Sequence, residues 1–224
     1  MTTGIVVVTG GAGFIGSHSV EALLASGWQV RVLDNFSTGK RANLPSASAL
    51  SIHEADIRDR AAVAGIVHGA DAVLHLAAQV SVQASVADPL TSADVNVTGF
   101  LNVFDAARRA GAKRIVYASS AAVYGVPARL PLDEGAPTRP ISPYGLEKSI
   151  NDQYAALFAS LYETSALGVR YFNVYGPRQD PRSPYAGVVS KFVDMARAGK
   201  PLTVFGDGLQ SRDFVYVKDV AVVN

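Results

Sequence analysis

The stretch that decides the fold is IVVVTGGAGFIGS, residues 5–17. Its first part is a run of β-branched residues, which predicts a buried strand over Ile5–Gly10. The pattern then becomes helical from Phe14 to Ser26, and Gly27 is a typical helix end. A buried strand that turns at once into a helix indicates an α/β fold with a parallel sheet.

Glycines fill the turn between this strand and this helix. Such a turn leaves no side chain in the way, so a pyrophosphate can approach the backbone and bind at the helix N-terminus. A glycine turn that only packs a helix closely against a strand is the alternative, but the strand–turn–helix context favours a dinucleotide. The glycines fit two spacings, Gly10-x-x-Gly13-x-x-Gly16 and Gly11-x-Gly13-x-x-Gly16.

An acidic residue, Asp34, ends the second predicted strand, QVRVLD. At that place a carboxylate accepts hydrogen bonds from the 2′-hydroxyl of an adenosine ribose and repels a 2′-phosphate. The predicted cofactor is therefore NAD. Lys40 and Arg41 follow closely in the sequence, which keeps NADP open as the alternative.

The sequence from residue 29 to residue 176 continues the alternation of strands and helices, which predicts a Rossmann-type doubly wound parallel sheet. Ligands bind such sheets at the carboxyl ends of the strands. The predicted strands are Gln29–Asp34, Leu50–Asp56, Asp71–Ala78, Lys113–Ser120 and one within Leu167–Gly176; the predicted helices are Asp59–Val67, Thr91–Ala110 and Pro143–Glu163, and residues 122–140 form a loop.

The texture of the sequence changes after Gly176, where prolines crowd one loop. A helix near Gly187–Ala198 and two short strands are expected beyond that loop. We predict a dinucleotide-binding domain over residues 1–176, which returning strands would extend. Residues 177–224 are predicted to form a small second region, the expected substrate region, draped over the ligand edge of the sheet.

The composition limits the classes of function. Hydrophobic residues make up 49% of the 224 residues, enough for a large core, and the net charge of +1 argues against a nucleic-acid partner. No apolar run is long enough to span a membrane. The absence of cysteine excludes disulfides and thiolate metal sites, so no metal is predicted, and a reducing compartment, the cytoplasm, is expected.

A second informative stretch is ISPYGLEKSI, residues 141–150. Tyr144 and Lys148 are one helical turn apart, so both side chains can stand on one face. A nearby ammonium favours the phenolate and lowers the pKa of a tyrosine, which makes it a usable base. Ser120, at the end of the fifth strand, can hydrogen-bond the same substrate oxygen. The alternative is a chance spacing on a surface helix, with the lysine solvated.

Together these motifs resemble the extended short-chain dehydrogenase/reductases, and within them the NAD-dependent sugar-nucleotide epimerases and dehydratases, the UDP-glucose 4-epimerases most of all. The matching pieces occur in family order over nearly the whole chain. They are TGGAGFIGS, LDNFSTGK, ADIRD, LHLAAQ, DVNVTG, YASSAAVYG, SPYGLEK, RYFNVYGPRQ, VFGDG and SRDFVYVKDV.

The resemblance implies NAD-dependent C4 epimerisation of a UDP-hexose, glucose or galactose or their N-acetyl forms, through a 4-keto intermediate. Ser120, Tyr144 and Lys148 would be the catalytic residues. Related dehydratases carry an Asp-Glu pair after the fifth strand, where this chain has Ala121-Ala122, so elimination is disfavoured. A related dehydratase, decarboxylase or reductase, and a non-catalytic NAD-binding regulator, remain the alternatives.

The resemblance also implies binding residues. Those for the cofactor are Gly10, Gly13, Phe14, Ile15, Asp34, Asn35, Ser37, Gly39, Asp56, Ile57, Leu76, Ala77, Ala78, Asn96, Tyr144, Lys148, Tyr171 and Phe172. Those for the nucleotide sugar are Gln79, Ser81, Ser120, Asn173, Thr203, Phe205 and Arg212. Asn173 and Arg212 would contact the diphosphate, Thr203 and Phe205 the base, and Gln79 and Ser81 the sugar.

Two further expectations concern the whole molecule. In the family, the helices matching Thr91–Ala110 and Pro143–Glu163 pair into a homodimer interface; the alternative is that their apolar faces only cover the sheet. Family members also continue well beyond the position of Asn224, so the substrate region is expected to be incomplete. The identity of the sugar is therefore left open.

Overall fold

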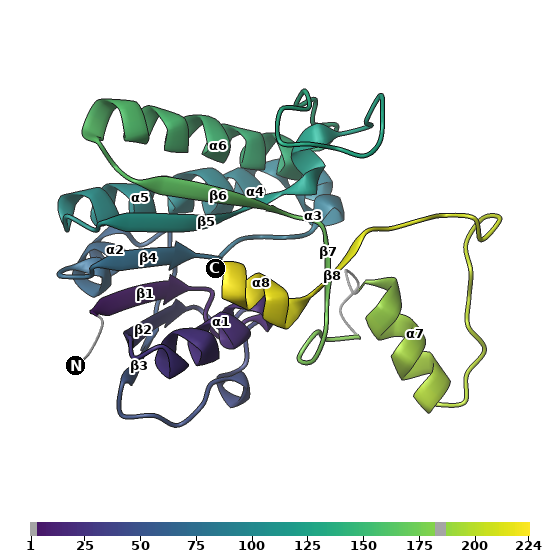
Figure 1. Cartoon of the computed structure of the whole chain (residues 1–224), viewed down its shortest axis with the longest axis horizontal. Helices are drawn as coiled ribbons and strands as arrows, with labels where there is room; N and C mark the ends of the chain where they lie inside the picture. Colours follow the sequence, from purple (N-terminus) through teal and green to yellow (C-terminus); the bar gives the residue numbers. More distant parts are fainter. Residues whose placement is uncertain (1–3, 182–186) are drawn as a thin grey trace.

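The computed structural model describes residues 4–181 and 187–224. A six-stranded parallel sheet, in the order β3-β2-β1-β4-β5-β6, forms its centre (Figure 1). The strands of this sheet are β1 (Ile5–Thr9), β2 (Gln29–Asp34), β3 (Leu50–Glu54), β4 (Ala72–His75), β5 (Arg114–Ser120) and β6 (Ala166–Tyr171). The chain order reverses between β1 and β4, so a crevice for ligands is expected at the carboxyl ends of these two strands.

Helices cover both faces of the sheet, as the doubly wound prediction requires. The helices of the described residues are α1 (Phe14–Ala25), α2 (Arg60–Val67), α3 (Val82–Ala87), α4 (Pro89–Ala93), α5 (Gly99–Arg109), α6 (Pro143–Tyr162), α7 (Val188–Arg197) and α8 (Val217–Val223). Short turns are η1 (Arg41–Asn43), the π-helical η2 (Asp94–Thr98) and η3 (Ala121–Tyr124). The strands β7 (Asn173–Tyr175) and β8 (Phe214–Tyr216) form a separate two-stranded parallel sheet.

The core consists of two layers that share the sheet. One layer packs α2, α5 and α6 against the sheet around Phe100, Phe104 and Tyr117, whose rings contact one another. The other layer packs α1 on the opposite face around Val20 and Val32. Because strands buried on both faces must be apolar throughout, the β-branched run of β1 is explained by its central place in the sheet.

The predicted helix over Thr91–Ala110 differs in detail. The helical segment begins earlier, at Pro89, because the Asp88 side chain caps it by accepting a hydrogen bond from the Thr91 N–H at 3.1 Å. It then widens into the π-helical turn η2, in which the Gly99 N–H bonds the Asp94 carbonyl. The predicted strand over Asp71–Ala78 is also shorter, since only Ala72–His75 pairs on both sides.

The C-terminal part also differs from the prediction of two strands after the helix. One strand, β7, precedes α7, and only β8 follows it among the described residues. The chain then forms α8, which lies against α1 (Figure 1). Val217, Val220 and Ala221 form the buried face of α8, with a helical spacing that the prediction overlooked.

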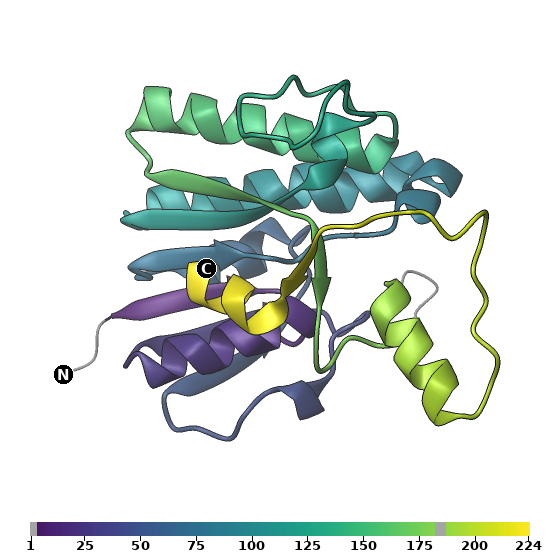
Figure 2. The same cartoon turned by 45° about the vertical axis from the view of Figure 1, so that its right-hand side comes forward.

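The segment after β7 is attached to helix α1. His18 bonds the Pro177 carbonyl at 3.0 Å, and Arg178 forms an ion pair with Glu21 of α1. Beyond residue 187, α7 and the long exposed connection to β8 lie away from the sheet (Figure 2).

Candidate active site

The glycine turn is shaped by close backbone contacts that exclude side chains. Gly10 has φ +68°, and a Cβ there would lie 2.7 Å from the Ala77 nitrogen. A Cβ at Gly16 would lie 2.1 Å from the Gly10 carbonyl oxygen. The N-cap of α1 is Gly13, which has no side chain to cap the helix, so the first N–H groups of α1 are left for a ligand. These features fit the pyrophosphate of a dinucleotide.

Asp34 lies beside this turn, where the ribose of such a cofactor is expected. Its carboxylate is buried and accepts hydrogen bonds from the Ala12 N–H at 2.9 Å and the Phe36 N–H at 2.8 Å. A Cβ at Gly39 would come within 2.9 Å of the Asp34 carboxylate, so glycine keeps this approach open. Each carboxylate oxygen has more than one lone pair, and Asp34 therefore keeps the capacity to bind ribose hydroxyls.

The two cations that left NADP open both have partners. Lys40 forms an ion pair with Asp180 at 3.0 Å. Arg41 forms one with Glu54 at 2.7 Å and lies over the Phe36 ring, 4.4 Å from its centroid. Since both cations are paired with carboxylates on the surface, and Asp34 itself would repel a 2′-phosphate, the surroundings of Asp34 favour NAD.

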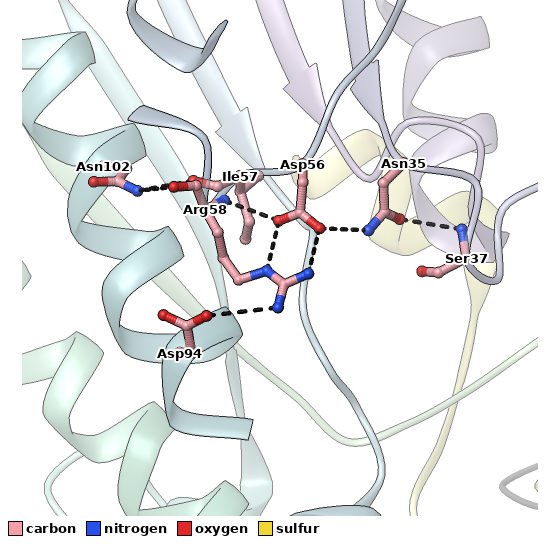
Figure 3. A network of polar contacts seen from close by, with 7 residues as sticks. All are labelled: Asn35, Ser37, Asp56, Ile57, Arg58, Asp94 and Asn102. Carbon is pink, nitrogen blue, oxygen red and sulfur yellow. Dashed lines mark hydrogen bonds and ion pairs between the residues drawn. The ribbon is translucent and has the colours of Figure 1, made fainter. Parts of the chain in front are cut away.

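A polar network continues from this ribose segment to the expected adenine edge (Figure 3). Asn35 accepts a hydrogen bond from the Ser37 N–H and donates one to Asp56 at 3.0 Å. Arg58 binds Asp56 with two side-chain bonds of 2.9 and 2.8 Å, and its hydrogen bonds hold the pKa of Asp56 well below the usual range. Arg58 also reaches Asp94 of η2 at 3.5 Å.

Ile57, the other residue expected at the adenine edge, is held in place by α5. Its carbonyl accepts a hydrogen bond from the Asn102 side chain of α5 at 3.0 Å (Figure 3). Its side chain is buried, 2.6 Å from where a Cβ on Gly99 would stand. The position of Asp56–Ile57 is therefore set by both β3 and α5.

The predicted catalytic residues come together at the carboxyl end of β5. Ser142 caps α6 by accepting a hydrogen bond from the Gly145 N–H at 3.1 Å, and Pro143 begins the helix. The Ser120 hydroxyl accepts a hydrogen bond from the Ala122 N–H at 3.1 Å and lies close enough to the Tyr144 hydroxyl to lower its pKa. The Lys148 ammonium is 5.9 Å from the centroid of the Tyr144 ring and donates to the Ala118 carbonyl at 3.0 Å.

Lys148 is buried, not solvated as the chance-spacing alternative requires. Burial lowers its pKa to about 8, against opposing effects of the Asp152 and Glu147 carboxylates. Burial, followed by the charge of Lys148, lowers the pKa of His75 on β4 to about 3. His75 is therefore neutral at physiological pH, and its Nδ1 lies 2.7 Å from the Thr9 hydroxyl.

The lowered tyrosine pKa expected from the sequence is not found in the protein itself. Burial raises the pKa of Tyr144 above its ordinary value, and the Glu147 carboxylate acts in the same direction. The hydrogen bond with Ser120 lowers it, but not enough to compensate. Desolvation of the phenolate thus outweighs the stabilisation that the neighbouring groups provide.

The residues expected along the middle of the cofactor lie opposite the glycine turn. The Thr9 hydroxyl accepts hydrogen bonds from the N–H groups of Leu76 and Ala77, each at 3.2 Å. This fixes the chain after β4 close to Gly10, where the Ala77 backbone leaves no room for a Cβ. Ala78 follows directly in the same segment.

Three other predicted contact residues have their polar groups bonded inside the protein. Asn96 is buried and bonds the Gln79 backbone on both sides, accepting from its N–H and donating to its carbonyl, each at 2.9 Å. The Gln79 side chain bonds the Ser81 backbone and the Ser92 hydroxyl. Ser81 is buried and caps α3 by accepting from the Ala84 N–H at 2.9 Å. Their contacts to ligands stay a prediction.

The predicted diphosphate and base contacts lie in the exposed C-terminal part. Asn173 and Arg212 are near in space, because the Asn173 side chain donates to the Asp213 carbonyl at 2.9 Å. The Arg212 guanidinium is exposed and bonds only the neighbouring Ser211 carbonyl among the interactions found for the described residues. Thr203 and Phe205 are exposed on the long connection between α7 and β8. The structure does not bring this pair to the carboxyl end of β5.

Tyr171, predicted near the nicotinamide together with Phe172, is the last residue of β6, and Phe172 follows it directly. The Tyr171 hydroxyl donates to the Asn224 side chain, and burial raises its pKa. Phe172 is 39% exposed beside β7. No group of three or more His, Cys, Asp or Glu suited to a metal ion occurs among residues 4–181 and 187–224.

Sequence reasoning missed two elements of this site. Glu147, on the turn between Tyr144 and Lys148, is a buried carboxylate that the motif alone did not single out. Arg58 organises Asp56, although only Asp56 and Ile57 were predicted to matter. The available signal was an acidic residue placed next to a lysine on a helix that was expected to face the sheet.

Comparisons with known proteins agree with this geometry. Residues 6–224 match a family model described as the NAD dependent epimerase/dehydratase family. The chain is 43% identical over 220 residues to the UDP-glucose 4-epimerase of Mycolicibacterium smegmatis, covering 96% of this chain and 70% of that protein.

Two solved structures are similarly close. The UDP-N-acetylglucosamine 4-epimerase from Methanobrevibacter ruminantium, in complex with UDP-N-acetylmuramic acid, has a TM-score of 0.96 at 42% identity, covering 100% of this chain and 72% of that one. The Thermus thermophilus UDP-glucose 4-epimerase complex with NAD has a TM-score of 0.88 at 43% identity, covering 97% of this chain and 72% of that one.

Proposed function

Because this chain belongs to the NAD dependent epimerase/dehydratase family, we propose that it inverts the C4 centre of a UDP-hexose. The substrate class is UDP-glucose and UDP-galactose or their N-acetyl forms, and the reaction passes through a 4-keto sugar. The observation that carries this proposal is the arrangement of Ser120, Tyr144 and a buried Lys148 at the same sheet edge as the glycine turn.

The chain's own residues handle the proton at the sugar 4-oxygen. Bound NAD supplies the acceptor and then the donor of the C4 hydride. Tyr144 takes the proton from the 4-hydroxyl and returns it after the keto sugar has turned over, so no net proton or electron is consumed. Ser120 shares the hydrogen bond to that oxygen. A placed proton-transfer group of this kind is typically worth about 10²–10⁴-fold.

Lys148 supports this proton transfer from below the tyrosine ring. Its ammonium is held by the Ala118 carbonyl, so it keeps a fixed place relative to Ser120 on the same strand. A fixed positive charge stabilises the Tyr144 phenolate, the form that must be present before Tyr144 can take the proton from the 4-hydroxyl. The raised pKa of Tyr144 makes this support necessary, because an unassisted buried phenolate is costly.

Within the same family, the sequence after β5 favours epimerisation over elimination. Dehydration requires an acid and a base near the sugar, and η3 begins with Ala121-Ala122 directly after Ser120. We therefore keep a dehydratase, decarboxylase or reductase as a second candidate only on the strength of the family's breadth. A non-catalytic NAD-binding role fits less well, because the whole catalytic set is present.

We also propose that the protein is a homodimer, with α6 at its interface. Four side chains one or two turns apart on this helix are exposed: Leu146, Tyr154, Leu157 and Leu161. The apolar side chains of α5 are instead largely buried against the sheet and α2, so α5 contributes less to this face than the sequence suggested.

The described residues contain no helix long and apolar enough to cross a membrane. The cytoplasmic location stays a prediction.

The test is to incubate the protein with NAD and each of the four UDP-hexoses, and to resolve the products by chromatography. We expect interconversion of a C4 pair without accumulation of NADH. Tyr144→Phe should lower the turnover rate by at least about 100-fold, while NAD binding, measured by fluorescence, is retained. Near-normal epimerisation by this variant would refute the proposed chemistry, and accumulating NADH or loss of water from the sugar would favour the second candidate.

A further inference from the structure

Glu147 is a buried carboxylate to which the proposed chemistry gives no role. It is 4% exposed and lies on α6 between Tyr144 and Lys148. One of its oxygens, Oε2, accepts two hydrogen bonds, from the Ser92 hydroxyl at 2.9 Å and from the Asn96 side-chain amide at 2.7 Å. Burying a carboxylate is costly unless strong hydrogen bonds compensate, so this arrangement needs an explanation.

Both donors to Glu147 also bind Gln79. The Asn96 amide holds the Gln79 backbone from both sides, as described above. The Ser92 hydroxyl accepts a hydrogen bond from the Gln79 side chain at 3.2 Å. Glu147 thus fixes the orientation of Ser92 and Asn96, and these two fix the backbone and the side chain of Gln79.

Gln79 is the point where this network reaches the ligand crevice. It follows Leu76–Ala78, which lie against the glycine turn, and precedes α3. The π-helical turn η2 that carries Asn96 is of a kind found frequently at functional sites. A second tie joins the same parts, because the Tyr144 N–H donates to the buried Ser85 hydroxyl of α3 at 3.1 Å.

We propose that Glu147 is a positioning residue, which acts through Asn96 and Ser92 to hold the segment Leu76–Ser81 in register with Tyr144. Under the proposed function this segment would face the sugar and the reacting end of the cofactor, so this inference rests on that proposal. The buried carboxylate of Glu147 on α6 thus connects the segment Leu76–Ser81 to Tyr144, the proposed base. Misplacement of that segment by about 1 Å can lower the rate about 100-fold.

Two substitutions separate the hydrogen bonds of Glu147 from its charge. Glu147→Gln keeps a carbonyl oxygen that can accept from both donors, whereas Glu147→Ala removes both bonds and leaves Asn96 with an unpaired donor. Glu163→Gln is the matched control, since it removes a carboxylate at the exposed C-terminal end of the same helix. Ser92→Ala removes one of the two bonds and serves if the alanine variant does not fold.

The first measurement does not depend on activity. Hydrogen exchange at the Gln79 amide, which donates to Asn96, reports directly whether this segment is held. We expect exchange to accelerate about tenfold or more in Glu147→Ala, less in Ser92→Ala, and not in Glu147→Gln or Glu163→Gln. If the Gln79 amide is protected from exchange as well in Glu147→Ala and Ser92→Ala as in wild type, the proposal is overturned. This outcome does not depend on whether the protein is an epimerase.

The second measurement is steady-state turnover of the UDP-hexose that the wild type accepts. We expect kcat/KM to fall about tenfold or more in Glu147→Ala and to stay within about threefold of wild type in Glu147→Gln. Rescue by glutamine identifies the hydrogen bonds as the cause. An equal loss in both variants, with protection at Gln79 intact in the glutamine variant, would show that the charge acts instead and would contradict positioning. If wild type turns over no UDP-hexose, the proposed function fails, while the exchange result still decides the role of Glu147.

Discussion

At the scale of single residues, the sequence placed Tyr144 and Lys148 correctly but not their surroundings. The spacing of one turn is a local property, so both residues could be assigned to one helix face. The burial of Lys148 and its bond to Ala118 depend on how α6 packs on β5, which a pattern of residues does not contain. The raised pKa of Tyr144 has the same origin, since burial is its largest cause.

The depressed pKa of Lys148 predicts a dependence of stability on pH. The pKa of Lys148 is about 8 in the folded protein and 10.5 for the ordinary group. Between these pH values the lysine is therefore protonated in the unfolded chain and largely neutral in the folded protein. Lys148 therefore costs stability below about pH 8, and this cost disappears as the pH rises to 10.5. We expect Lys148→Met to unfold at a higher temperature than wild type at pH 7, with the gap shrinking by pH 10.

Thermal unfolding at the two pH values checks this expectation. Lys200→Met, which removes an exposed lysine, is the control and should show no such gap. A Lys148→Met variant that is less stable than wild type by the same amount at both pH values would contradict the cost of burial.

We expect Asp34 to select the cofactor. Its carboxylate is expected to accept the ribose hydroxyls and to repel a 2′-phosphate, and Lys40 and Arg41 are already paired. Asp34→Ala should weaken NAD binding about tenfold or more and bring the affinities for NAD and NADP close together, because a charged hydrogen bond and a repulsion are lost together. Binding titrations with both dinucleotides measure this, with the exposed Asp133→Ala as control. An unaltered preference for NAD would assign the selection to another group.

At the scale of elements, prediction succeeded where pattern and packing agree. The six sheet strands and α1, α2 and α6 were expected within a few residues of where they lie, because each has its own periodicity and end signals. The short helices α3 and α8 were missed. Helices this short have little periodicity of their own and depend on contacts such as those of Val217 and Val220 with the α1 side of the sheet.

Glycines in two helices give a direct test of the role of the first turn of α1. A Cβ at Gly16 would lie 2.1 Å from the Gly10 carbonyl oxygen, while nothing lies within 4 Å of a Cβ at Gly65 in α2. Gly65→Ala should therefore stabilise the protein by about 0.5–1 kcal/mol through helix propensity. Gly16→Ala should destabilise it and weaken NAD binding, because the turn must open.

Denaturant unfolding and NAD titration measure both variants. Gly65→Ala is the matched control, since the same substitution is made in a helix with free space. Wild-type NAD affinity in a folded Gly16→Ala protein would show that the turn tolerates a side chain and that its closeness is not needed for the cofactor.

At the scale of the whole molecule, the exposed apolar face of α6 predicts association. Leu157 and Leu161 are 52% and 66% exposed and lie one turn apart on this face. Leu157→Glu with Leu161→Glu should convert the proposed dimer to a monomer without unfolding it, since both side chains are on the surface. Light scattering with size-exclusion chromatography measures the mass. Leu209→Glu, at an exposed leucine on the connection before β8, is the control and should leave the mass unchanged. A wild-type protein that is already a monomer would remove the dimer proposal.

The side-by-side placement of β7 and β8 has a consequence for how this architecture can diversify. The chain leaves the nucleotide-binding half after β7 and comes back beside it at β8, so α7 and residues 198–213 are an excursion with both ends anchored at one place. Because this excursion shares few contacts with the central sheet, we expect that its sequence and length can be exchanged without rebuilding the end of the sheet beside Tyr144 and Lys148. Under the proposed function, grafting another homologue's excursion onto this scaffold should therefore alter which sugar nucleotide is preferred and leave the hydride transfer unchanged.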